Sequence, residues 1–301
     1  MDAWVPITIA GAFFQNLRSA LQKHLKGKLS DFGSAYARFC YAVPLAVIYC
    51  WLILHFQDAD LPPMEGRFLF FVTAGALLQM LFTWMLVWLF SFSNFAVGTT
   101  YSKTETIQIA VFGYLIIGDT MSLWSILAIV ISAAGLMALS VARSTVTVKT
   151  LFTSLGSKPA LVGIATGAML GSCVVCFRAA ALSLPEGDVY VRSAVTLALT
   201  LIIQTVLGAV WLIMREPGQL TAVLKNWRWG GAVGVSGVVA SIFWFIAMTM
   251  QNAAYVRAVG QIELVFTFIA SYFIFKERTN RIELLGIGLI VAGIVIILLL
   301  G

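Results

Sequence analysis

Two glutamates lie inside strongly apolar segments, where a charged side chain is costly and defaults to a functional role. Glu105 is near the centre of an expected helix over residues 94–117, and Glu263 is near the centre of one over 254–275. Two carboxylates near one cavity repel each other, and burial disfavours their charged forms. Such a pair can hold a proton at neutral pH and release it when the site opens. We therefore expect Glu105 and Glu263 to take up and release protons.

The alternative is a structural ion pair of Glu105 with Lys103 or Arg257. Lys103 and Glu105 are two residues apart on the expected helix, so they point about 200° apart and each needs a partner on another helix. Both cations are also candidates to bind an anionic group of a solute, such as a carboxylate. Arg257 is close to a helix end, where its long stem also lets the guanidinium snorkel to the membrane surface.

Further polar and aromatic side chains are expected to line the same site. Tyr101 and Gln108 lie four residues before and three residues after Glu105, which places them on its face of a continuous helix. Aromatic walls suit organic cations and flat solutes, although the same residues can serve helix packing or face lipid. The other candidate binding residues are central in their expected helices: Gln79, Trp84 and Trp244.

Four arginines lie within a turn or two of expected helix ends, and we expect them to snorkel or to anchor loops. They are Arg18, Arg38, Arg178 and Arg192.

The composition indicates that these side chains are carried by membrane-spanning helices. Hydrophobic residues make up 60% of the chain and charged residues 11%, against about 25% charged in soluble domains. A spanning helix needs about 20 mainly apolar residues. We therefore expect an all-α polytopic membrane protein of ten helices, with a lipid bilayer as its surroundings. The expected helices cover residues 4–22, 32–54, 68–91, 94–117, 121–142, 160–183, 188–213, 230–251, 254–275 and 281–300.

The charge of the loops alternates along the chain. The odd-numbered loops carry the basic residues, whereas loop 2 has Arg67 among three acidic residues. By the positive-inside rule the odd-numbered loops are cytoplasmic, which places both termini outside. The basic residues of the odd-numbered loops are Lys23, Lys26, Lys28, Arg143, Lys149, Lys158, Arg215, Lys225, Arg228, Lys276, Arg278 and Arg281.

An internal repeat divides the chain into two five-helix halves, residues 1–148 and 149–301. Five is an odd number, so the second half must enter the membrane from the opposite side, as in the inverted repeats of secondary transporters. Chance similarity between apolar helices is the alternative. The matches at an offset of 158 residues are Asn94 with Asn252, Glu105 with Glu263, Asp119 with Glu277, and Ala134-Gly135 with Ala292-Gly293. At an offset of 154, Gly33-x-x-Tyr36-x-Arg38 matches Gly187-x-x-Tyr190-x-Arg192.

The ending of each half, an acidic turn followed by a helix with glycine, resembles the repeat of the drug/metabolite transporter superfamily, EamA type. The residues are Gly118-Asp119 through Gly135, and Glu277 through Gly286 and Gly293, with Arg38 and Arg192 early in the second helix of each half. The resemblance implies a carrier of small metabolites, amino acids or drugs in the bacterial inner membrane. It also implies cytoplasmic termini, against the loop charge. The central glutamates depart from the family's usual pattern.

Motifs of enzymes, metal sites and nucleotide-binding loops are missing from the sequence, so we expect neither catalysis nor a cofactor or metal. Cys173-x-x-Cys176 is expected to be two small buried residues, and no basic helix fits nucleic acid. The favoured hypothesis is a secondary exporter of a small-molecule substrate, coupled to protons by alternating access. An uncoupled facilitator and a non-transporting scaffold are the alternatives, and a monomer is compatible with the sequence.

Overall fold

The computed structural model describes residues 2–25, 27–93, 95–142, 144, 147–273 and 280–301. Their regular structure is helical, and no strand occurs among them. The predictions that concern Lys26, Asn94, Arg143, Lys276, Glu277 and Arg278 lie outside the described residues.

Each of the ten expected ranges coincides with one helix or with two consecutive helices. The single helices are α1 (Trp4–Gln22), α4 (Gly66–Phe90), α7 (Leu123–Ala142), α9 (Lys158–Ser183), α10 (Val189–Arg215), α12 (Trp227–Met250) and α15 (Arg281–Leu300). Several of their ends have side-chain caps, which satisfy backbone N–H groups that lack a partner within the helix. Asp188 accepts a hydrogen bond from the Val191 N–H at the start of α10, and Asn280 and Glu283 form a capping box at the start of α15.

The expected helices over 94–117 and 254–275 are not continuous, so this part of the sequence prediction is wrong. The first consists of α5 (Phe95–Ser102) and α6 (Glu105–Ile117), and the second of α13 (Ala253–Gly260) and α14 (Ile262–Phe273). The range 32–54 also divides, into α2 (Asp31–Cys40) and α3 (Val43–Phe56). Short helices in the loops complete the described fold: η1 (Lys23–Leu25), α8 (Val148–Thr153) and α11 (Gln219–Lys225).

Local hydrogen bonds explain the break between α5 and α6. The Ser102 hydroxyl donates to the Thr99 carbonyl at 2.8 Å, and the Thr104 hydroxyl donates to the Tyr101 carbonyl at 2.7 Å. Such bonds give the backbone carbonyls an alternative to the helical ladder. At the other break, Gly260 precedes Gln261, and glycine weakens a helix interior by about 1 kcal/mol relative to alanine.

Among the described residues, seven helical segments are long and apolar enough to cross a membrane, which confirms an all-α polytopic membrane fold. They are the run Asp31–Phe56 and the helices α4, α7, α9, α10, α12 and α15. The parts of α5/α6 and α13/α14 have 8 to 13 residues each, so neither part alone is long enough to span. The number of ten spans stays a prediction.

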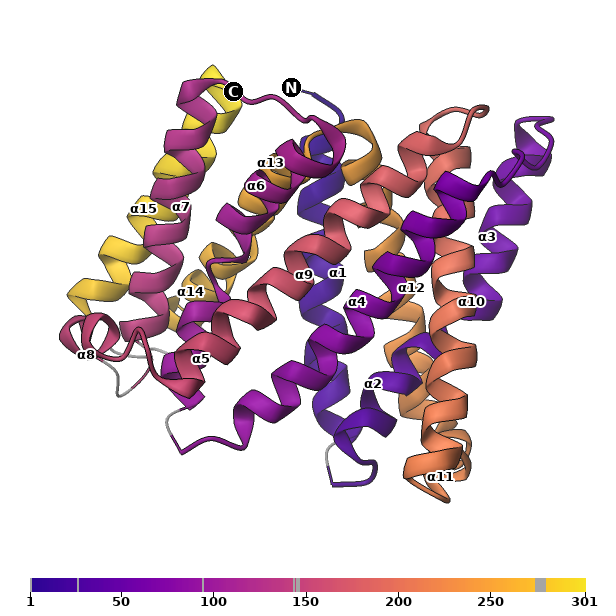
Figure 1. Cartoon of the computed structure of the whole chain (residues 1–301), viewed down its shortest axis with the longest axis horizontal. Helices are drawn as coiled ribbons and strands as arrows, with labels where there is room; N and C mark the ends of the chain where they lie inside the picture. Colours follow the sequence, from indigo (N-terminus) through magenta and orange to yellow (C-terminus); the bar gives the residue numbers. More distant parts are fainter. Residues whose placement is uncertain (1, 26, 94, 143, 145–146, 274–279) are drawn as a thin grey trace. The chain divides into compact units, whose positions relative to one another are not determined.

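The chain forms two compact units, each assembled from both predicted repeats. Unit 1 comprises Met1–Met80 and Cys176–Gln251, and unit 2 comprises Leu81–Val175 and Asn252–Gly301. In unit 1, α1 packs along α12, and α3 packs along α10 (Figure 1). The repeat boundary near residue 148 is a division by sequence and stays a prediction.

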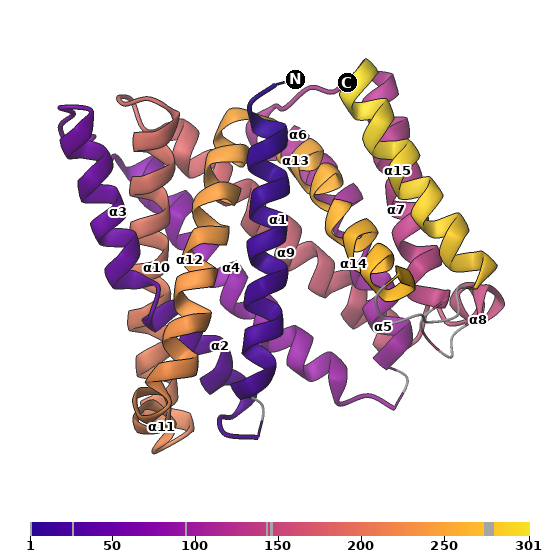
Figure 2. The same ribbon diagram turned by 180° about the vertical axis from the view of Figure 1, so that it is seen from behind.

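In unit 2, α7 and α15 lie side by side along their lengths (Figures 1 and 2). Glycines bring the two backbones together: a Cβ atom added at Gly135 would lie 2.7 Å from the Gly286 carbonyl oxygen, and one added at Gly293 would lie 2.7 Å from the Ala128 carbonyl oxygen. The repeat offset of 158 converts one contact into the other: adding it to Gly135 gives Gly293, and subtracting it from Gly286 gives Ala128. This exchange is expected for two segments related by a pseudo-two-fold axis.

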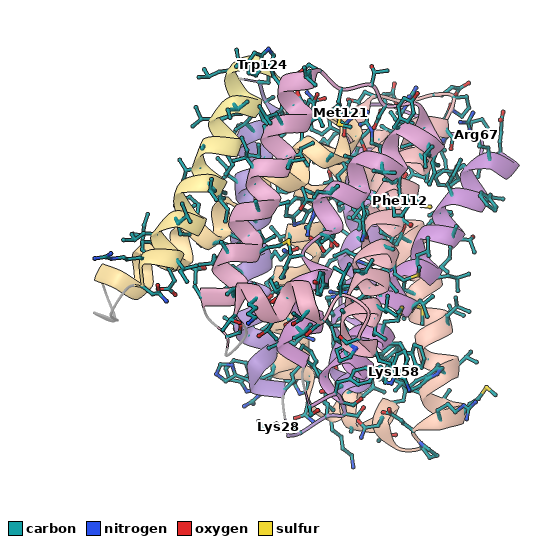
Figure 3. All side chains as sticks on the ribbon, turned by 60° about the vertical axis from the view of Figure 1, so that its left-hand side comes forward. Lys28, Arg67, Phe112, Met121, Trp124 and Lys158 are labelled. Atoms are coloured by element: carbon teal, nitrogen blue, oxygen red, sulfur yellow. The ribbon has the colours of Figure 1, made fainter. Side chains whose placement is uncertain are left out.

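The ends of the helices carry the loop residues whose charge alternates. Within unit 1, Lys28 of loop 1 and Arg67 of loop 2 lie at opposite ends of the helices (Figure 3). Within unit 2, Trp124 after loop 4 and Lys158 of loop 5 are likewise at opposite ends (Figure 3). Loops 1 and 2 of unit 1, and loops 4 and 5 of unit 2, therefore lie at opposite ends of the helices of their unit.

Candidate functional site

The two central glutamates both lie directly after a helix break in unit 2. Glu105 is the first residue of α6, and Glu263 is in the first turn of α14. Helix N-termini stabilise negative charge because unpaired N–H groups and the helix dipole point toward it. The α5/α6 and α13/α14 pairs also correspond at the offset of 158, since α5 begins at Phe95 and α13 at Ala253. The helix break is therefore part of the repeat.

Glu105 forms an ion pair with Arg257 across two neighbouring helices. The Arg257 guanidinium, in the last turn of α13, donates through Nη2 to the Glu105 Oε1 atom at the start of α6. Residue Glu105 is only 9% exposed. The helix dipoles favour a cation at the end of α13 and an anion at the start of α6, so the backbone supports the sign of both partners. Figure 2 shows α6 and α13 next to each other.

A second hydrogen bond joins the same two helices one turn along. The Gln261 amide Nε2 donates to the Thr106 hydroxyl at 3.0 Å, and both side chains are buried. Gln261 follows Arg257 by four residues, and Thr106 follows Glu105 by one. The end of α13 and the start of α6 are thus held by two adjacent polar contacts.

Arg257 is attracted by two carboxylates. Besides its ion pair with Glu105, it interacts electrostatically with Glu263. The residue equivalent to Arg257 in the first break, 158 positions earlier, is Thr99. The repeat therefore provides a glutamate after each break but an arginine at this position only in the second break.

The helix break separates Lys103 and Tyr101 from Glu105, so the prediction that Tyr101 shares its face through one continuous helix is wrong, whereas Gln108, three residues after Glu105 on α6, stays on that face. Lys103 lies in the turn between α5 and α6 and is exposed. The Tyr101 hydroxyl donates to the Leu151 carbonyl at 2.7 Å and so anchors α8. The Gln108 amide Nε2 donates to the Ile164 carbonyl at 3.3 Å and to the Thr104 hydroxyl at 3.1 Å.

The remaining candidates lie elsewhere in the fold. Trp84 is 46% exposed and stacks on Trp88, with 5.8 Å between the ring centroids. Gln79 and Trp244 belong to unit 1, a different compact unit from the glutamates. There, Gln79 accepts a hydrogen bond from Gln204 at 2.6 Å, while Trp244 is buried.

Glycines of α9 let this helix approach the first helix break. A Cβ atom added at Gly167 would lie 2.9 Å from the Ser102 carbonyl oxygen and 3.4 Å from the Glu105 nitrogen. One added at Gly171 would lie 3.4 Å from the Ile109 nitrogen. The backbone of α9 therefore forms the wall behind Glu105.

Sequence reasoning found Glu105, Glu263 and Arg257 but missed Thr106 and Gln261. The repeat contained a signal for Gln261, because it occupies the position equivalent to Lys103 beside the first break. No sequence signal marks Thr106, since only the approach of α13 gives its hydroxyl a partner.

Comparisons with known proteins agree with this architecture. Residues 158–299 match the sequence model of the EamA-like transporter family. A crystal structure titled only as that of a protein superposes with a TM-score of 0.69 at 15% identity, covering 98% of this chain and 99% of that one. This likeness concerns the fold alone. No curated protein sequence matches the chain.

Proposed function

Residues 158–299 match the EamA-like transporter family, and on this premise we propose that the chain is a secondary carrier that couples the movement of a small organic solute to protons through Glu105 and Glu263. Export across a bacterial inner membrane is the direction and location that we propose with it.

The observation that carries the proposal is the cluster of Glu105, Glu263 and Arg257 at the two equivalent helix breaks. In secondary transporters, discontinuous helices form the sites for substrates and coupling ions, because their half-helix ends present unpaired backbone groups inside the membrane. A carboxylate paired with arginine stays ionised, whereas a carboxylate that loses its counter-ion in an apolar region favours the protonated form. Separation of Arg257 from Glu105 would therefore favour uptake of a proton.

Alternating access would supply that separation. The proposed cycle has one state in which Arg257 pairs with Glu105 and another in which the pair is open and Glu105 holds a proton. A solute that binds one state better than the other shifts the equilibrium between them, which links its movement to that of the proton. Glu263, which also attracts Arg257, is the second carboxylate available to the same guanidinium.

An uncoupled facilitator is a second candidate, and the ion pair itself favours it. A buried glutamate whose charge is balanced by arginine can be purely structural. In this case solute would equilibrate across the membrane without moving protons.

Proton flux in proteoliposomes tests the proposal. A thermal-shift screen of small metabolites on the purified protein first provides the test solutes, and pyranine trapped inside the vesicles then reports the internal pH. A solute gradient is expected to change the internal pH with the wild-type protein and to leave it unchanged with E105Q or E263Q. Glu186→Gln, in an exposed loop, is the matched control and should behave as wild type.

Unchanged proton flux in the E105Q/E263Q double variant would contradict proton coupling. Solute counterflow that persists after the proton gradient is collapsed, and that moves no protons, would support the facilitator instead.

A further inference from the structure

A groove lies between α6 and α7 in unit 2, and the proposed transport site does not use it. Its volume is about 470 Å³. One face of α6 and one face of α7 form its walls, and it ends at the turn between them, loop 4 (residues 118–122). The wall side chains are apolar and include Ile107, Val111, Leu115, Ile126 and Val130.

The groove is open to the surface along both helices. Leu115 on α6 is 69% exposed, and Val130 on α7 is 46% exposed. Because α7 is long and apolar enough to cross a membrane, side chains exposed along it contact the hydrocarbon of the bilayer. Ile107 and Leu115 are eight residues apart, so about 12 Å of α6 lines the groove. An elongated apolar ligand, such as an acyl chain, matches this shape.

Aromatic side chains mark the loop 4 end of the groove as the level of the lipid head groups. Tyr114, which lines the groove, is 62% exposed, and Trp124, in the first turn of α7, is 55% exposed. Tyrosine and tryptophan are enriched where the membrane meets water. Figure 3 shows Trp124 at the same end of unit 2 as Met121 of loop 4, opposite Lys158.

The charge at this end is negative. Residues 113–125, which include loop 4 and both adjoining helix ends, contain Asp119 and no lysine, arginine or histidine. The last helix adds its negative end, since the Ser122 hydroxyl donates to the Leu300 carbonyl of α15 at 3.4 Å. Arg281, at the start of α15, is 19 residues or about 28 Å away. Anionic lipids are attracted by basic clusters, so this end favours a head group with a positive charge.

We propose that the groove binds a phospholipid of the phosphatidylethanolamine type, with one acyl chain between α6 and α7 and the ammonium of the head group at the Asp119 carboxylate. An ionised carboxylate accepts about four hydrogen bonds, so an ammonium can bond to Asp119 alongside partners within the protein. The Thr120 hydroxyl, which also lines the groove, can donate to a phosphate oxygen of the same head group. The inference does not rest on the proposed function.

The equivalent turn of the second repeat has a different charge in the sequence. The offset of 158 relates Asp119-Thr120 to Glu277-Arg278, and Lys276 and Arg281 flank that pair. This comparison is one of sequence, since residues 274–279 lie outside the described part of the chain. An ammonium head group is attracted by the acidic turn of the first repeat, whereas the basic turn of the second would attract an anionic one.

Competition between two lipids with the same acyl chains tests the inference. The purified full-length protein in a neutral detergent receives equal amounts of dioleoyl phosphatidylethanolamine and dioleoyl phosphatidylglycerol, and native mass spectrometry counts the lipids retained. The wild type should prefer phosphatidylethanolamine by about fivefold or more. Asp119→Asn should abolish this preference, and Asp119→Glu should keep it. Glu186→Gln, in an exposed loop of unit 1, is the matched charge control and should behave as wild type.

A pair of valine variants tests the groove itself. Val130→Trp places an indole in the groove, so it should lower the amount of phosphatidylethanolamine retained. Val295→Trp is the matched control, because Val295 lies on α15, outside the groove, and is 45% exposed against 46% for Val130. The head-group comparison leaves the walls of the groove unchanged, so it still tests the inference if Val130→Trp does not fold.

Three results would overturn the inference: equal retention of the two lipids by the wild type, an unchanged preference in Asp119→Asn, or equal lipid retention by Val130→Trp and Val295→Trp. Two further results would assign the groove to another occupant. Displacement of the retained phosphatidylethanolamine by an equal amount of dodecylammonium would indicate a soluble amphiphilic amine, and a dimer lost only in Val130→Trp would indicate a second copy of the chain. Proton flux is not measured, so failure of the proposed function leaves this test unaffected.

Discussion

The helix break between α5 and α6 and the one between α13 and α14 occupy equivalent positions, yet they carry different side chains. Each break is followed by a glutamate in the first turn of the next helix, Glu105 or Glu263. The position of Arg257 in the second break is taken by Thr99 in the first, and Gln261 corresponds to Lys103. The helix break is present in both repeats, whereas an arginine at this position is present only in the second.

This difference indicates which features belong to the fold and which to the chemistry. A glutamate after each break is compatible with the helix dipole in both halves and so fits the repeat. An arginine occupies this position only in the second break, and it forms its ion pair with the glutamate of the first break, Glu105. We expect substitutions at equivalent positions of the two breaks to have unequal effects.

The largest effect is expected at the position of the arginine. Arg257→Gln leaves the buried Glu105 without its counter-ion, and removal of one partner of a buried ion pair costs about 3–5 kcal/mol. Thr99→Ala, at the equivalent position, removes only a hydroxyl that donates to the Ala96 carbonyl at 3.0 Å, which should cost about 1 kcal/mol or less. Unfolding by SDS in mixed micelles measures both. Equal losses would show that the two breaks are equivalent in energy.

A smaller contrast is expected between the two glutamates. Glu105→Gln keeps a hydrogen-bond acceptor for Arg257 but loses the charge, so we expect a loss of about 2 kcal/mol, in the range of hydrogen bonds to charged groups. Glu263→Gln should cost less, about 1 kcal/mol, because Arg257 keeps its direct partner Glu105. The same SDS titration compares the two variants. A larger loss of stability in Glu263→Gln than in Glu105→Gln would make Glu263 the principal partner of Arg257.

The smallest contrast concerns the residues beside each break. Gln261→Leu removes the buried hydrogen bond to Thr106, which should cost about 1 kcal/mol. Lys103→Leu, at the equivalent position, alters an exposed side chain in a turn and should change stability by about 0.5 kcal/mol at most. Melting temperatures in detergent are sufficient for this comparison. A Lys103→Leu variant that melts well below Gln261→Leu would indicate an additional contact of the lysine.

The positions of the helices followed from the sequence because hydropathy reports where a chain can satisfy its backbone in lipid. It could not predict the breaks, since an interrupted helix is as apolar as a continuous one. The signal at α5/α6 was local, a run of threonine and serine hydroxyls from Thr99 to Thr104 that bond to preceding carbonyls. At α13/α14 the single Gly260 was a weaker signal.

The sequence predicted the charged residues of the candidate site but not which of them pair. Intramembrane charge singled out Glu105, Glu263 and Arg257, because charge in lipid is costly wherever it occurs. The choice of Arg257 as the partner of Glu105 depends on α13 lying against α6, 152 residues apart in sequence. Tyr101 was assigned to the face of Glu105 on the assumption of a continuous helix, and the break removed that geometry.

The close contact between α7 and α15 also has a consequence for the synthesis of the protein. α7 begins at Leu123 and its partner α15 at Arg281, near the end of the chain. A ribosome adds about 5–20 residues per second, so α7 is made roughly 8–30 s before α15. During this interval the glycine face around Gly135 has no partner helix from its own chain. Assembly of unit 2 is therefore completed only after α15 has been translated and inserted into the membrane.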